Sequence, residues 1–125
     1  MKNLIIDSAT DRVFFKIIAV NKSYTSDYPN SRENFDKLVV LLFSFLDKNK
    51  INIKEIDNIF VNQGPGKFSG IRASISIAKA LSITNSINLY GFSSLDLKDM
   101  NYMNIAFLYE KGCLIKNLIK PLYLS

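Results

Sequence analysis

Short apolar runs separated by polar turns dominate the first part of the chain. Apolar residues occupy positions 4–6 and most of 13–20, and turn-forming residues follow each run. The polar segment 21–23 is typical of a hairpin turn into a third strand at 24–28. We therefore expect the chain to begin with three strands joined by tight turns.

A helix is predicted over 32–47, with Ser31 as its N-cap. Its apolar side chains cover an arc of about 200°, whereas a helix packed on one sheet needs about 100° or a little more. The excess predicts a second apolar contact, either with a neighbouring helix or with another chain. The residues in this arc are Phe35, Leu38, Val39, Leu42, Phe43, Phe45 and Leu46.

A second helix is predicted over 69–83, after a strand at 58–62 and a loop that contains three glycines. Ala73, Ser76 and Ala80 place small side chains on one side of this helix, where another helix could approach closely.

The remaining segments complete an α/β pattern. A strand is predicted at 87–90 and a short helix, capped by Ser93 or Ser94, toward 100. Residues 104–125 are interpreted as a strand pair around 110–112 with an extended tail. The order βββ-α-β-α-β predicts a mixed sheet with helices on its faces.

Composition narrows the class of protein. The 125 residues, 48% hydrophobic, suffice for one modest core with a small appendage. The net charge is +5, but the lysines are scattered, so we interpret them as solvated surface, with contact to RNA or another polyanion as the alternative. The longest apolar run, 38–43, is far shorter than a membrane span, so a cytoplasmic protein without membrane contact is expected.

Residues for catalysis and metal binding are scarce. Cys113 is the single cysteine and is expected to be a small buried hydrophobe in a reducing compartment. The chain has no histidine, which removes the commonest general base and the commonest zinc ligand. We predict no catalytic residue, no metal site and no cofactor.

The residues that could take part in catalysis or ligand binding lie at the end of the first strand and in the glycine loop. Asp7 follows the first strand, and doubly wound sheets bind ligands at the carboxyl ends of strands. Asp7 could hold Mg²⁺ or polarise an attacking group, or it could close an Asx turn. Gly64, Gly66 and Gly70 precede a helix, so their loop could present backbone N–H groups to an anion or could form an ordinary tight turn. The loop matches neither the Walker A motif nor the dinucleotide fingerprint.

Arg72 falls in the first turn of the helix after this loop, where the helix dipole disfavours a cation. This placement predicts a partner for Arg72, either a carboxylate within the fold or an external anion.

Three motifs, in order, resemble the TsaB (YeaZ) family of the tRNA threonylcarbamoyladenosine system. They are Ile-Asp-Ser-Ala-Thr at 6–10, Gly-Pro-Gly-Lys-Phe-Ser-Gly-Ile-Arg at 64–72 and Gly-Phe-Ser-Ser-Leu at 91–95. The family has serine where Lys67 stands, so this chain adds a cation to the loop. The resemblance implies a ribonuclease H-like lobe of the actin and sugar-kinase type over 1–100. Members carry a second domain, of which 101–125 would be a shortened remnant.

The resemblance also implies a function. TsaB is a noncatalytic partner of TsaD, the subunit that transfers a threonylcarbamoyl group to the tRNA adenosine next to the anticodon, and its contact with tRNA is expected to be weak or indirect. A homodimer through the same helices is an alternative assembly. A small nucleotide-binding phosphotransferase or ATPase of the sugar-kinase type, using Asp7, is the alternative function. The residues expected at the interface are Phe35, Leu38, Val39, Leu42, Ala73, Ser76 and Ala80.

Overall fold

Six strands form a single mixed sheet in the order β3-β2-β1-β4-β5-β6. The computed structural model describes residues 1–97, 101–117 and 119–122. β1, β4 and β5 run parallel to one another, while β2, β3 and β6 pair antiparallel with their neighbours. The strands are β1 (Asn3–Asp7), β2 (Arg12–Ile18), β3 (Ser23–Pro29), β4 (Asn58–Asn62), β5 (Asn88–Phe92) and β6 (Ile115–Lys116).

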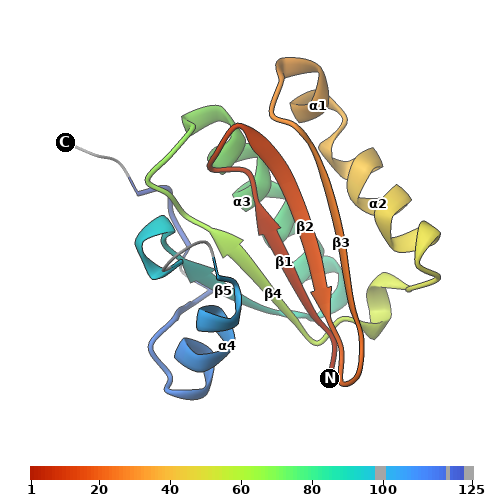
Figure 1. Ribbon diagram of the computed structural model, residues 1–125, viewed down its shortest axis with the longest axis vertical. Helices are drawn as coiled ribbons and strands as arrows, with labels where there is room; N and C mark the ends of the chain where they lie inside the picture. The colour runs from red at the N-terminus through yellow and green to blue at the C-terminus, as the bar shows by residue number, and fades with distance from the viewer. Residues whose placement is uncertain (98–100, 118, 123–125) are drawn as a thin grey trace.

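Helices cover both faces of this sheet, as Figure 1 shows with α3 behind the sheet and α4 in front of it. None of the helices in the described part of the chain is both long and apolar enough to cross a bilayer. The helices are α1 (Arg32–Asp36), α2 (Leu38–Lys48), α3 (Phe68–Asn85) and α4 (Met103–Glu110), with short 3₁₀ turns at Ile53–Glu55 and Ser94–Asp96.

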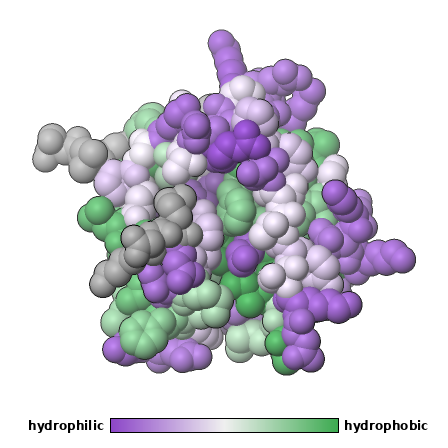
Figure 2. Space-filling view, viewed as in Figure 1, coloured by the Kyte–Doolittle hydropathy of each residue, from purple (hydrophilic) through white to green (hydrophobic). Residues whose placement is uncertain are grey.

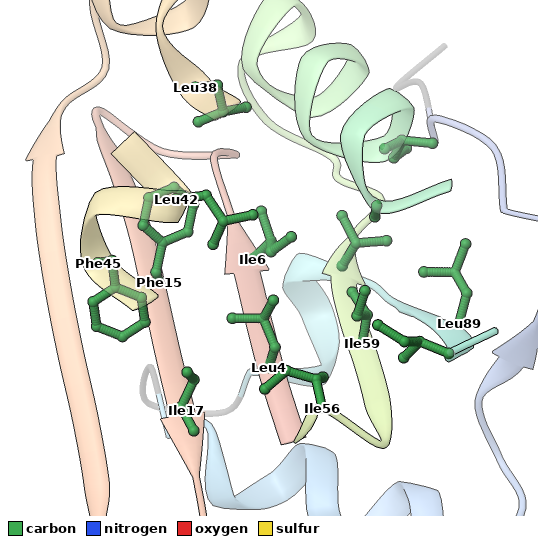
Figure 3. Close-up of a cluster of buried hydrophobic side chains, with 14 of the residues drawn as sticks. Leu4, Ile6, Phe15, Ile17, Leu38, Leu42, Phe45, Ile56, Ile59 and Leu89 are labelled. Carbon is green, nitrogen blue, oxygen red and sulfur yellow. The ribbon is translucent and has the colours of Figure 1, made fainter. Parts of the chain in front are cut away.

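The sheet separates two hydrophobic cores, because successive side chains of a strand point to opposite faces. Leu4 and Ile6 of β1 belong to the larger core, which packs against α2 and α3 (Figure 3). Ile5, between them, belongs to a smaller core with Phe60 and with Ile105 of α4. The mixed sheet with helices on its faces was therefore predicted correctly.

The predicted helix over 32–47 is broken at Lys37 into α1 and α2. Ser31 caps its start as expected, since its Oγ accepts a hydrogen bond from the Asn34 N–H at 3.3 Å. No proline or glycine lies between 32 and 48, so the sequence carries no local signal for the break.

The predicted strand pair around 110–112 is wrong, because 103–110 form α4. Tyr102, Ile105 and Tyr109 follow a helical spacing and pack on the smaller core, and that burial outweighs the strand propensity of the segment. Gly112, with φ of 69°, ends the helix. Cys113 follows it and is exposed, so the prediction that it is buried is also wrong.

Candidate functional site

A buried carboxylate organises the carboxyl ends of β1 and β4. Asp7 is 2% exposed. Its Oδ1 accepts hydrogen bonds from the Ala9 N–H at 3.0 Å and from the Asn62 amide at 3.1 Å. Its Oδ2 accepts one from the Tyr102 hydroxyl at 2.7 Å. The contact with Ala9 is the Asx turn that was one alternative for Asp7 in the sequence.

Tyr102 connects α4 to this carboxylate. Its ring stacks on Phe14 of β2, with centroids 4.8 Å apart and an interplanar angle of 12°. Burial raises the pKa of the Tyr102 phenol, and the Asp7 carboxylate beside it raises the pKa further. The hydroxyl therefore stays protonated and donates its hydrogen to Asp7 at neutral pH.

The glycine loop packs against the turn between β1 and β2. A Cβ at Gly66 would overlap the carbonyl oxygen of Ala9, and one at Gly70 would overlap that of Ser8. The Lys67 N–H donates to the Ala9 carbonyl at 2.8 Å, so one of the donors that an anion would need is already used. The close approach explains why glycine is required at both positions.

Further hydrogen bonds join the loop to β4 and to the segment after β5. The Gly64 N–H donates to Asn62 Oδ1 at 2.7 Å, and the Gly64 carbonyl accepts from the Ser94 N–H at 2.9 Å. The Ser94 hydroxyl donates to the Pro65 carbonyl at 2.8 Å. The loop is thus built into the fold as the junction between β4 and α3.

Anion binding at this junction stays a prediction. The Ser8 hydroxyl, fully buried beside Gly70, has no hydrogen-bond partner within the described residues. The guanidinium of Arg72 lies 5.2 Å from the centroid of the Phe68 ring, a cation–π contact. Among the residues that the structure describes, Arg72 forms no salt bridge, so the carboxylate partner suggested as one alternative is not found there.

The C-terminal segment closes the same end of the sheet. The Gln63 side-chain amide donates to the Lys120 carbonyl at 3.0 Å, and the Leu122 N–H donates to the Gln63 carbonyl at 2.7 Å. These contacts hold the C-terminal segment against Gln63, the residue that follows β4. Within 1–97, 101–117 and 119–122, no cluster of three or more acidic or cysteine side chains could hold a metal ion.

The outer surfaces of α2 and α3 form an apolar groove of about 470 Å³, which we call the α2–α3 groove. Three of the predicted interface residues line it, namely Val39, Ser76 and Ala80. The other lining residues are Phe43, Ile53, Ile77, Leu81, Thr84 and Asn85.

Other predicted interface residues lie elsewhere. Leu38 and Leu42 are 1% and 0% exposed and point into the larger core (Figure 3), so their assignment to a surface is corrected. The apolar arc of the predicted helix was wide because much of it packs on the sheet. Ala73 is half-buried against the same core, and the side chain of Phe35 lies outside what the structure describes.

Sequence reasoning missed the partners of Asp7. Tyr102 is 95 positions away in the chain and lies on a helix that was interpreted as strand. Asn62 donates to Asp7, and Ser94 is hydrogen-bonded to Asn62. Both had a usable signal, because Asn62 ends one predicted strand, Ser94 follows another, and the carboxyl ends of these parallel strands meet that of β1. Ile77 and Leu81 of the groove also follow the helical spacing of Ala73 and Ala80.

Comparison with known proteins identifies the family. Residues 29–104 match the family described as TsaD: tRNA N6-adenosine threonylcarbamoyltransferase. A protein of Buchnera aphidicola subsp. Schizaphis graminum (strain Sg), named tRNA threonylcarbamoyladenosine biosynthesis protein TsaB, is 31% identical over 94 residues. The chain belongs to the TsaB (YeaZ) family. The match to this TsaB covers 75% of the chain but only 45% of the relative, so the chain spans less than half of that relative's length.

The sequence of this TsaB-family chain is also similar to those of the transferases. The tRNA N6-adenosine threonylcarbamoyltransferase of Clostridioides difficile (strain 630) is 33% identical over 66 residues, which cover 53% of this chain and 20% of that protein. TsaB-family and transferase sequences therefore share this region.

Solved structures confirm the fold expected for a TsaB-family lobe. YeaZ from Pseudomonas aeruginosa has a TM-score of 0.71 at 19% identity, over 89% of this chain and 50% of that one. The structure titled T. thermophilus RuvC in complex with Holliday junction substrate has a TM-score of 0.62 at 9% identity, over 93% and 99% of the two chains. The fold is the ribonuclease H-like lobe.

Proposed function

We propose that this chain is a noncatalytic partner subunit that binds a TsaD-type transferase through the α2–α3 groove. In this role it supports transfer of the threonylcarbamoyl group to the tRNA adenosine next to the anticodon and supplies no catalytic residue. The names of its relatives connect the family with threonylcarbamoyladenosine biosynthesis. The observation that carries the proposal is the groove, an apolar surface that the described part of the chain leaves uncovered.

The groove has the properties of a helix-docking surface. Val39 on α2 is 50% exposed, and Ala80 on α3 is exposed as well. Small side chains at Ser76 and Ala80 permit close approach of a partner helix, while Phe43 and Leu81 supply apolar contact area. Burying such a surface against a partner is favourable at about 25 cal/mol per Å² of apolar area.

The shared sequence region suggests the geometry of the complex. Residues 29–104, which match the transferase family, include α1, α2 and α3. A TsaD-type protein is therefore expected to present a similar pair of helices. Two related surfaces can pack around an approximate twofold axis, as the two copies of a homodimer do.

The alternative, a small phosphotransferase or ATPase, finds little support at Asp7. Its carboxylate accepts three hydrogen bonds from the described part of the chain, and the side chain is almost fully buried. A nucleotide or Mg²⁺ would have to displace Tyr102 before it could reach this group.

Replacing Val39 by Asp tests the proposal. Because Val39 is half exposed, Val39→Asp should fold normally, whereas in the complex the new carboxylate would be buried without a partner. The wild-type chain should co-elute with the TsaD-type protein of the same cell in gel filtration at micromolar concentration. Val39→Asp should elute separately.

The matched control is Val40→Asp, the same substitution at the next position of α2. Val40 is 63% exposed and does not line the groove, so this variant should keep the complex. Separate elution of the wild-type pair would contradict the proposal, and equal weakening by both variants would exclude the groove as the binding surface. A dimer of this chain alone that Val39→Asp dissociates would assign the groove to self-association.

A further inference from the structure

A second hollow lies at the opposite end of the sheet from Asp7, where the turn between β2 and β3 meets the start of β1 and the end of α2. Its volume is about 370 Å³, and we call it the hairpin hollow. Figure 1 shows this turn beside the N-terminus at the lower end of the sheet, and Figure 2 shows that this corner of the molecule is largely hydrophilic. It is separate from the α2–α3 groove and shares no residue with it.

The hairpin hollow carries an excess of positive charge. Lys2, Lys22 and Lys50 all line it, and no acidic residue does so among the described residues. Lys2 is paired with Glu55, with Nζ and Oε1 3.4 Å apart. Lys22 and Lys50 form no salt bridge with any residue in the described part of the chain, so their charges are available to a ligand.

Lys50 occupies a backbone position that usually holds glycine or asparagine. Its φ is 57°, and its N–H donates to the Asp47 carbonyl at 3.0 Å, just after the end of α2. An L-residue with a long side chain is strained there, whereas glycine is not. Lys48 already supplies a cation to the last turn of α2, so the helix dipole alone gives little reason for a second lysine.

Apolar side chains complete the hairpin hollow. Val20 is 80% exposed at the turn. Tyr24 of β3 also lines the hollow, and its half-buried side chain packs against the larger core. Proteins that bind single-stranded nucleic acids combine these two features, aromatic side chains for the bases and lysines for the phosphates. An acidic peptide would use the lysines, but it offers a group to stack on Tyr24 only where it carries an aromatic side chain.

We propose that the hairpin hollow binds a single-stranded segment of nucleic acid. Lys22 and Lys50 contact neighbouring phosphates, and one base packs against Tyr24 and Val20. This site goes beyond the proposed function and does not depend on the α2–α3 groove.

Fluorescence anisotropy with labelled oligouridine and oligothymidine of about 12 nucleotides, a common site size, tests this proposal on the full chain. In the double variant Lys22→Ala, Lys50→Gly, the slope of log K against log salt concentration should become shallower by about 0.7 for each phosphate contact removed. Glycine relieves the strain at position 50, so lost binding would not reflect unfolding. Tyr24→Leu should weaken binding by at least about fivefold, the lower end of the range for one stacked base.

The control is Lys79→Ala, Lys111→Ala, which removes the same charge outside the hairpin hollow and should leave the salt slope nearly unchanged. Tighter binding of oligouridine than of oligothymidine would identify RNA as the ligand. Equal binding of the two would identify single-stranded RNA and DNA alike as ligands. Three results would overturn the proposal: no binding of either oligonucleotide at low salt, an equal loss in the control, or full affinity in Tyr24→Leu. The Lys22 and Lys50 variants should still co-elute with the TsaD-type protein, so failure here leaves the partner role intact.

Discussion

At the scale of single residues, the central feature is a buried carboxylate, that of Asp7, which accepts three hydrogen bonds from the described part of the chain. Asp7 accepts from a backbone N–H, an amide and a phenol, and these donors lie on three separate segments of the chain. A buried charge is tolerated only when it is hydrogen-bonded in this way. We therefore interpret Asp7 as a structural residue that fixes α4 against the ends of β1 and β4.

Removing the Tyr102 hydroxyl tests this interpretation. Tyr102→Phe keeps the stacking on Phe14 but deletes the hydrogen bond to Asp7, so the free energy of unfolding should fall by about 1.5 kcal/mol, the low end of the range for a bond to a charged group. Unfolding in urea, monitored by circular dichroism, would measure this difference in the free energy of unfolding. No change would mean that the Asp7 carboxylate finds another donor.

The same variant should alter the dependence of stability on pH. Burial and Asp7 raise the pKa of Tyr102 above the value of about 10 in the unfolded chain. The stabilisation is then fully present below about pH 10 and is lost as the pH rises toward the folded-state pKa. The difference in free energy of unfolding between wild type and Tyr102→Phe should therefore shrink above about pH 10. A constant difference would contradict the raised pKa.

At the scale of elements, the glycine loop acts as a spacer that lets α3 approach the turn between β1 and β2. A methyl group at Gly70 would collide with the Ser8 carbonyl, so Gly70→Ala should destabilise the fold by about 1–3 kcal/mol through overpacking. Thermal unfolding would reveal it as a lower Tm. Gly112→Asn is the control, because the space around Gly112 is open and asparagine tolerates its positive φ. Equal stability of Gly70→Ala and Gly112→Asn would contradict the close approach of α3 to the turn between β1 and β2.

The elements that could be predicted from the sequence are those whose apolar residues follow one clear periodicity. The strands β1 to β5 and helix α3 follow from apolar runs and turn residues, and the glycine loop falls between β4 and α3 as expected. The break at Lys37 could not be predicted, because the sequence carries no local signal for it. Helix α4 was missed because burial of its apolar side on the smaller core outweighs the strand propensity of the segment. Leu38 and Leu42 were misassigned, since a helical wheel does not tell which apolar side faces the sheet and which faces a groove.

At the scale of the whole molecule, the two faces of the sheet are covered unequally. The larger core lies under α2 and α3, whereas the other face depends on α4 and the segments beside it. In Figure 2, which views that second face, hydrophobic residues gather over α4 at the lower left. The segment after 97 therefore contributes to the stability of the whole lobe, although it lies mostly beyond the motifs that identify the family.

Truncation after Leu97 tests this dependence. Loss of α4 would expose Ile5, Phe60 and Phe92 and would remove the Tyr102 donor from Asp7. Since burial of one large apolar side chain contributes about 1.5–3 kcal/mol, we expect a loss of several kcal/mol, comparable to the whole stability of a small domain. The truncated chain should bind the dye ANS and show a broadened urea transition, as loosely packed states do. Phe107→Ala in the full chain is the control, because Phe107 is 56% exposed and its removal should change the transition little. A truncated chain with the wild-type transition would show that residues 1–97 fold without α4.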